Sequence, residues 1–111
     1  MTFDEYQCEA MRTAPIFSDA SESLLNGLMG LCGESGECID LLKKARFQGH
    51  PMDVEHMAKE LGDVAWYLAN SANAIGYSLE DICKLNVKKL RNRYPDGFEV
   101  NRSVNRDKND I

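Results

Sequence analysis

Four carboxylates fall into two acid pairs with the same spacing, Glu34 with Glu37 in GESGE and Glu60 with Asp63 in KELGD. Residues three apart on an α-helix lie on one face, so each pair directs two carboxylates toward the same patch of space. Two such helices packed side by side bring all four acids to one point. Clustered acids repel one another unless cations offset their charge, and oxygen ligands alone favour Mg²⁺ or Mn²⁺ over zinc.

Other interpretations of the acids compete with this metal site. A single acid pair is typical of an exposed helix face, where Lys59 is spaced to form an ion pair with Asp63. A di-iron carboxylate site needs Glu-x-x-His motifs on two helices, and neither of the two histidines follows a Glu by three residues. We expect His56 to take part in a helix start instead. No histidine is placed to activate a serine or cysteine nucleophile, and no phosphate-binding glycine loop occurs.

The acid pairs need helices to position them, and the apolar spacing predicts an all-α antiparallel bundle of about four helices with no strand. The predicted helices cover approximately residues 2–12, 22–47, 53–76 and 78–95. A capping box of Thr2 and Glu5 starts the first helix, Asp53 caps the third, and Ser78 with Asp81 starts the fourth. Residues 18–23 are expected to form a polar loop before the second helix.

Two apolar stripes are expected to form the core and to pass beside the acid pairs. The stripe on the second helix consists of Leu28, Leu31, Cys32, Ser35, Ile39 and Leu42. The stripe on the third helix consists of Met57, Leu61, Val64, Leu68, Ala72 and Ile75. Gly27 and Gly30 lie on the same side of the second helix as Glu34, where small residues leave room either for a ligand or for a closely packed helix.

Composition limits the class of protein. At 111 residues the chain fits a single domain, which we place at residues 1–98, followed by a polar tail at 99–111 that lacks periodicity. A net charge of −5 argues against a partner that is a nucleic-acid polymer or an anionic membrane. The chain has no apolar run of transmembrane length and no signal-peptide pattern. We therefore expect a soluble, cytoplasmic protein.

Three segments resemble consecutive motifs of a known family, the MazG-like group of all-α nucleoside triphosphate pyrophosphohydrolases. They read GESGECIDLLKK, KELGDVAWYLANSANAIGYSLEDI and NVKKLRNRYPDGF. The resemblance covers approximately residues 24–98. Many members begin the first motif with two adjacent acids, and here Gly33 occupies the first of those places. In the family the paired acids bind Mg²⁺, so the resemblance implies Mg²⁺ (or Mn²⁺) at Glu34, Glu37, Glu60 and Asp63.

The reaction that the resemblance implies is hydrolysis of a (deoxy)nucleoside triphosphate between its α and β phosphates, giving a nucleoside monophosphate and pyrophosphate. Glu34 or Glu37 is then the candidate to orient the attacking water. Asn86, Lys89 and Arg93 share one side of the fourth helix, and the similar family segment contacts triphosphate. Tyr67 is a further candidate for phosphate or sugar binding, with a half-buried structural role as the alternative. The competing function is a non-catalytic helical interaction module with acidic pairs on its surface.

We also predict self-association. Several apolar residues lie outside the two predicted stripes. Together they would form an exposed apolar patch, and a patch of that size usually marks an interface. These residues are Leu24, Leu25, Met29, Trp66 and Tyr77. For Trp66 we favour a core or interface role over base stacking. The resemblance implies a homodimer or homotetramer in which a neighbouring subunit completes the nucleotide pocket.

Overall fold

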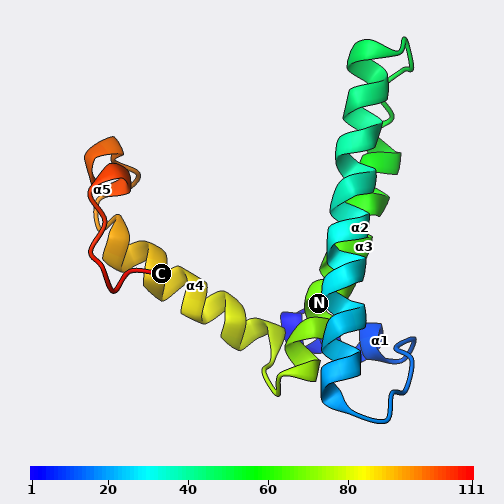
Figure 1. Cartoon of the computed structure of the whole chain (residues 1–111), viewed down its shortest axis with the longest axis horizontal. Helices are drawn as coiled ribbons and strands as arrows, with labels where there is room; N and C mark the ends of the chain where they lie inside the picture. Colours follow the sequence, from blue (N-terminus) through cyan, green and yellow to red (C-terminus); the bar gives the residue numbers. More distant parts are fainter. The chain divides into compact units, whose positions relative to one another are not determined.

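The computed structural model describes residues 1–111 and contains five α-helices and no β-strand, which confirms the all-α prediction (Figure 1). The helices are α1 (Phe3–Met11), α2 (Ala20–Phe47), α3 (Val54–Ala74), α4 (Leu79–Arg93) and α5 (Val100–Val104). The chain divides into two compact units, Met1–Leu79 and Glu80–Ile111, and each is described by itself. None of the helices combines the length and the apolar composition needed to cross a bilayer.

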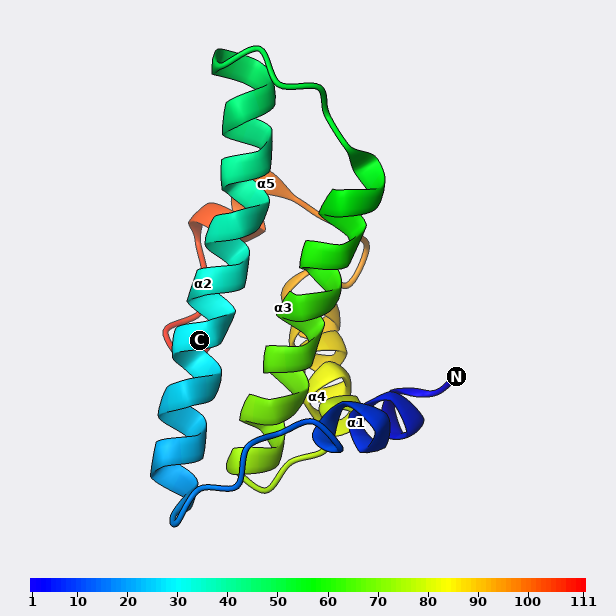
Figure 2. The same cartoon turned by 90° about the vertical axis from the view of Figure 1, so that its right-hand side faces the viewer.

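In the first unit, α2 and α3 run antiparallel side by side, and α1 packs against α3 (Figure 2). Side-chain caps at all three N-termini set these helices in place. Thr2 and Glu5 form the predicted capping box, and the Asp53 carboxylate accepts a hydrogen bond from the backbone N–H of His56 at 3.0 Å. The start predicted for the second helix was two residues late, because Asp19 caps α2 through the N–H of Glu22 at 2.9 Å.

Small side chains, rather than the predicted apolar stripes, fill the contact between α2 and α3. A Cβ added to Gly27 would lie 2.5 Å from the Ser71 hydroxyl, and one added to Gly30 would lie 2.0 Å from the Tyr67 ring. The buried segment of α3 is Ala69–Asn70–Ser71–Ala72. The two glycines therefore make room for a closely packed helix.

The prediction that both apolar stripes form the core of this chain was wrong for most of their members. Ala72 is buried, but six large apolar members of the stripes are between 41% and 63% exposed. These are Leu28, Ile39, Leu42, Leu61, Leu68 and Ile75. The helix pair is in closest contact at Gly27 and Gly30, and the large apolar residues on either side of this contact keep much of their surface exposed.

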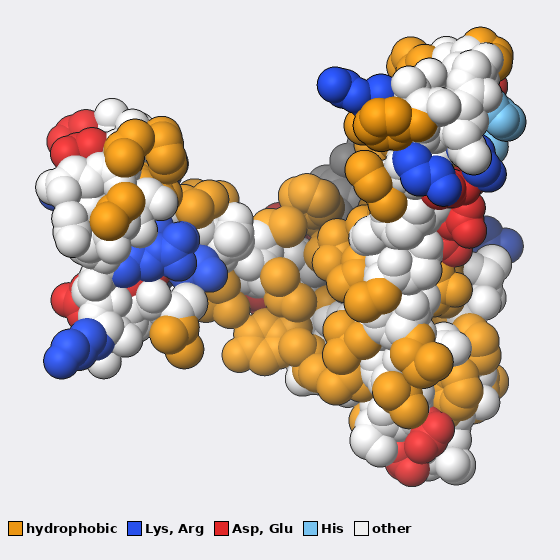
Figure 3. Space-filling model, turned by 45° about the horizontal axis from the view of Figure 1, so that its top comes forward, with side chains coloured by type: hydrophobic (Ala, Val, Ile, Leu, Met, Phe, Trp, Pro, Cys, Tyr) orange, Lys and Arg blue, Asp and Glu red, His pale blue; other side chains and the backbone are white.

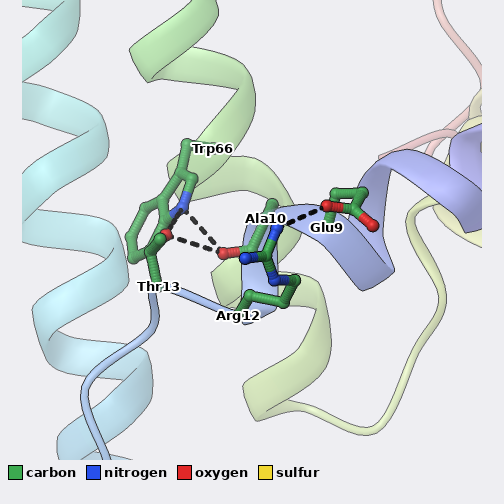
Figure 4. A network of polar contacts seen from close by, with 5 residues as sticks. All are labelled: Glu9, Ala10, Arg12, Thr13 and Trp66. Atoms are coloured by element: carbon green, nitrogen blue, oxygen red, sulfur yellow. Dashed lines mark hydrogen bonds and ion pairs between the residues drawn. The ribbon is translucent and has the colours of Figure 1, made fainter.

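Trp66, which we expected in excess of the monomer core, is held by α1 of its own chain (Figure 4). Its indole N–H lies 3.0 Å from the Ala10 carbonyl oxygen and 2.9 Å from the Thr13 hydroxyl oxygen. Gln7 also attaches α1 to its neighbours. Its side-chain amide donates to the Ala69 carbonyl of α3 and accepts from the N–H of Leu79 at 2.9 Å. Trp66 is thus a half-buried structural residue of the first unit.

The second unit consists of α4 and the segment 94–111. This segment contains the short helix α5, although the sequence predicted no helix in the tail. The chain then turns back to α4, where Asp110 accepts two hydrogen bonds from the Arg93 guanidinium, at 2.6 and 2.7 Å (Figure 1). The polar tail is therefore tied to the helix that carries the predicted phosphate-binding residues.

Gly30→Ala is expected to destabilise the protein, because the new methyl group meets the ring of Tyr67, itself packed edge-on against Trp66 at 4.9 Å between centroids. Overpacking of this kind costs about 1–3 kcal/mol. Gly33→Ala is the matched control, since nothing lies within 4 Å of its added Cβ. There the better helix propensity of alanine adds about 0.5–1 kcal/mol of stability. Urea denaturation measures both variants, and equal midpoints would contradict this packing.

The exposed apolar residues lead to a prediction about self-association. Figure 3 shows hydrophobic side chains gathered over the helix pair. On α2, Leu25 is 53% exposed and Met29 is 66% exposed. Soluble monomers rarely leave large apolar patches open to water. We expect light scattering at micromolar concentration to give a dimer or tetramer of the 12.5 kDa chain. A stable, active particle of 12.5 kDa would contradict the prediction.

Candidate metal centre

Three of the four predicted metal ligands converge between α2 and α3. Glu34, Glu60 and Asp63 each offer a carboxylate oxygen, and these oxygens all lie within 4.8 Å of one another. The three-residue spacing on α3 places Glu60 and Asp63 on one face of that helix. Glu34 comes from α2, one turn beyond Gly30, one of the two glycines at which α2 and α3 lie close together. Glu34 and Glu60 are half-buried and Asp63 is exposed.

The electrostatics of this acidic cluster favour an added cation or proton. Partial burial raises the pKa of Glu34, and the nearby charges of Asp63 and Glu60, a hydrogen bond with Glu60 and the charge of Glu37 raise it further. No Lys or Arg forms an ion pair with any of the three acids. Lys59, the alternative partner considered for Asp63, instead lies 3.3 Å from Glu55. The cluster is therefore not balanced by lysine or arginine in the chain.

His56 is a site residue that the sequence reasoning missed. Its Nε2 lies 2.9 Å from Oε1 of Glu60, whose side chain is 17% exposed. The contact holds Oε1 of Glu60 against the imidazole of His56. The i, i+4 spacing on α3 was the available signal, but His56 was considered only as part of the helix start.

Glu37 lies one turn after Glu34 on α2, is exposed and is outside the group of three converging acids. Its role as a fourth metal ligand or as the residue that orients water stays a prediction. Glu37 forms no ion pair with Lys44, whose ammonium lies 2.7 Å from Asp40. Asp40 is the main cause of the raised pKa of Lys44, to which the charge of Glu37 also contributes.

Two tyrosines lie near the cluster. Burial and the charge of Asp63 raise the pKa of the Tyr6 phenol. Tyr6 belongs to α1, so this helix also contributes a side chain to the electrostatic surroundings of the acids. Nothing in the local sequence indicated Tyr6, because α1 and α3 are brought together only by the fold. The Tyr67 ring packs over Gly30 and edge-on against Trp66, as expected for its structural alternative. Its contact with a substrate stays a prediction.

The predicted phosphate-binding residues Asn86, Lys89 and Arg93 lie on α4, within the second unit. Asn86 is exposed and Lys89 is half-buried. Arg93 is only 11% exposed, and its guanidinium is engaged by Asp110. Hydrogen bonding to Asp110 is the main cause of the raised pKa of Arg93. Arg93 is therefore not a solvated residue of the helix surface.

Comparison with known proteins identifies the family. Residues 21–98, which include both acid pairs, match the family described as the MazG nucleotide pyrophosphohydrolase domain. The chain is 36% identical over 102 residues to the "Gene 37 protein" of Mycobacterium phage L5, in an alignment that covers 84% of this chain and 89% of the phage protein. No solved structure matches the chain significantly. The converging acids and these matches confirm the resemblance seen in the sequence, and the chain belongs to the MazG nucleotide pyrophosphohydrolase family.

Proposed function

We propose that this protein hydrolyses (deoxy)nucleoside triphosphates between the α and β phosphates, with Mg²⁺ as its cofactor, and thereby removes non-standard or surplus nucleotides. The observation that carries the proposal is the convergence of Glu34, Glu60 and Asp63 without a lysine or arginine partner, in a chain of this family. On a non-catalytic interaction module, exposed acids would be expected to lie apart from one another. Here partial burial and the neighbouring acids together raise the pKa of Glu34.

The donor set fits Mg²⁺ or Mn²⁺. All three groups are carboxylates, which hard divalent cations prefer, and no sulfur ligand is present in the cluster. Glu34, Glu60 and Asp63 would hold the metal, with Glu37 as a fourth candidate ligand. When bound, such an ion neutralises phosphate oxygens and acidifies a coordinated water.

The protein's own residues have three tasks in this proposal. Glu34 or Glu37 accepts a hydrogen bond from the attacking water and orients it toward the α-phosphorus. Lys89 and Arg93, with Asn86 beside them, bind phosphate oxygens by charge-assisted hydrogen bonds. His56 holds the Glu60 carboxylate in one orientation through the contact at 2.9 Å, as residues behind a metal ligand commonly do.

A pyrophosphate-release screen tests the function directly. Canonical and modified nucleoside triphosphates are each incubated with the purified protein in Mg²⁺ and, as the control, in EDTA. We expect pyrophosphate and the nucleoside monophosphate to appear in equal amounts, and only with the metal. Release of inorganic phosphate instead would place the cleavage at the γ-phosphate, and an absence of all products over the whole panel would favour the interaction module.

A further inference from the structure

A basic cavity of about 540 Å³ lies within the second unit, between α4 and the tail. Five cationic side chains line it, Lys88, Lys89 and Arg93 from α4 and Arg102 and Arg106 from the tail. The acids that line it are Asp107 and Asp110. The side chains of the lining therefore carry a formal charge of 5 − 2 = +3, whereas the side chains of the whole chain sum to −5. A concentration of positive charge in an acidic protein favours an anionic ligand.

One anion already lies in this cavity, the carboxylate of Asp110. It makes a bidentate contact with the Arg93 guanidinium, with Nε to Oδ2 at 2.6 Å and Nη2 to Oδ1 at 2.7 Å. The side chains of the pair are 11% and 18% exposed. In every other ion pair of the chain at least one partner is 43% exposed or more. The Arg93 guanidinium is thus partly buried, and two of its nitrogen atoms are bound by the Asp110 carboxylate.

Cations from both walls of the cavity act on this carboxylate. Hydrogen bonding to Arg93 is the main cause of the lowered pKa of Asp110, and the charges of Arg106 and Lys89 lower it as well. Lys88, Lys89 and Arg106 form no ion pair of their own. Of the other two cations, Arg93 is paired with Asp110 and Arg102 lies 3.4 Å from Glu99. Three cations of the lining therefore have no ion-pair partner, and a phosphate chain carries several negative oxygens that suit them and the arginine fork.

We propose that this cavity binds a phosphate chain, that Arg102 and Arg106 of the tail are part of the binding site, and that Asp110 occupies the position of the phosphate on Arg93 until the ligand displaces it. The proposal rests on the proposed function only in its use of Lys89 and Arg93 for phosphate. It adds that the tail both completes the site and competes with the ligand for Arg93.

Two sources supply this ligand chemistry: the triphosphate of a nucleotide substrate, and free pyrophosphate. Titration calorimetry on the full chain, in EDTA so that the acidic cluster holds no metal, separates them with three probes: pyrophosphate, a nucleoside triphosphate and a nucleoside monophosphate. Equal affinities for the first two would show that the phosphate chain alone is bound. Tighter binding of the triphosphate would show that its third phosphate or its nucleoside is bound as well. The monophosphate is expected to bind more weakly than either.

Asp110→Asn tests the competition, with pyrophosphate as the probe. Freeing Arg93 is expected to lower the dissociation constant of pyrophosphate by at least about fivefold, since a charged hydrogen-bonding partner no longer has to be displaced. Asp107→Asn is the matched control, because it removes the same charge from the same tail without touching Arg93; it is expected to change the constant by about twofold or less. Affinity in Asp110→Asn no greater than in Asp107→Asn would overturn the competition.

Arg106→Gln tests the contribution of the tail and does not depend on the fate of the Arg93 contact. Arg106 is exposed, so its replacement leaves the fold intact. We expect pyrophosphate to bind at least about fivefold more weakly, as for the loss of a charge-assisted contact. Arg91→Gln is the control, because Arg91 is an exposed cation of α4 outside the cavity. Equal affinities in Arg106→Gln and Arg91→Gln would overturn the site.

These titrations are independent of hydrolysis. A protein that binds pyrophosphate as expected but cleaves no nucleotide would contradict the proposed function and leave the basic cavity as a binding site. A protein that cleaves nucleotides while all four variants bind pyrophosphate equally would keep the proposed function and refute the role of the tail.

Discussion

Glu60→Gln is expected to lower the turnover of the best nucleotide substrate by at least about a hundredfold, as loss of a principal charge-stabilising group commonly does. The substitution replaces a charged oxygen ligand with a neutral amide of the same shape. Asp63→Asn should act in the same way, because Glu60 and Asp63 face the same point from one helix. Steady-state rates of pyrophosphate release at saturating Mg²⁺ measure both effects.

The fold is expected to survive these substitutions, so helical circular dichroism should match that of the parent protein. Glu55→Gln provides the control on the same helix, since Glu55 is 82% exposed and contacts only Lys59. Its turnover is expected to stay within about twofold of the parent, because exposed ion pairs contribute little. If helical Glu60→Gln hydrolysed nucleotide at the parent rate, the assignment of the metal site would be wrong.

Glu34→Gln is expected to have opposite effects on stability and activity. In EDTA, the neutral side chain removes the repulsion that raises the pKa of Glu34, and its amide is able to donate to Glu60. The urea midpoint of the metal-free protein should therefore rise. Glu37→Gln should raise it less, because Glu37 is the smallest of the causes acting on Glu34. Turnover should nevertheless fall in Glu34→Gln, the conflict between stability and function expected at an active site.

The pH dependence of this gain follows from linkage. Glu34 has a pKa in the folded protein above the unfolded value of 4.5, so the folded state holds its proton more tightly. That stabilising contribution is complete below the unfolded pKa and is lost as the pH rises through the folded pKa. The advantage of Glu34→Gln over the parent should therefore be small in acid and grow toward pH 7. Three other acids have a lowered pKa and contribute equally to the stability of both proteins, so their contributions cancel in the comparison. They are Asp19, Asp40 and Asp110.

Mg²⁺ should reverse the order of stability, since a ligand that binds only the folded state stabilises it by mass action. Millimolar Mg²⁺ is expected to raise the melting temperature of the parent more than matched ionic strength from Na⁺ does, and to have little specific effect on Glu34→Gln. A lower midpoint for metal-free Glu34→Gln than for the parent would show that Glu34 has a stabilising partner, and equal shifts with the two salts would indicate screening alone.

The local features of this protein were determined by its sequence. Hydrophobic spacing and capping residues such as Thr2 and Asp53 act within a single turn of helix, so the four long helices were predicted with errors of a few residues at their ends. The acid pairs could also be predicted from the sequence, because the three-residue spacing of Glu60 and Asp63 places them on one face of a helix whatever the rest of the chain does. The family followed from the same motifs.

Contacts between helices were decided only by the tertiary structure. Periodicity shows that a helix has an apolar face, but not whether that face meets its own chain. Here Gly27 and Gly30 let α2 and α3 close along small residues, which left Leu61 and Ile39 exposed. The same approach carried Glu34 to Glu60 and Asp63 while leaving Glu37 outside the group. The Arg93–Asp110 contact joins residues 17 apart in the sequence, with only the short helix α5 between them. The path of that segment depends on packing and long-range charge rather than on any local pattern.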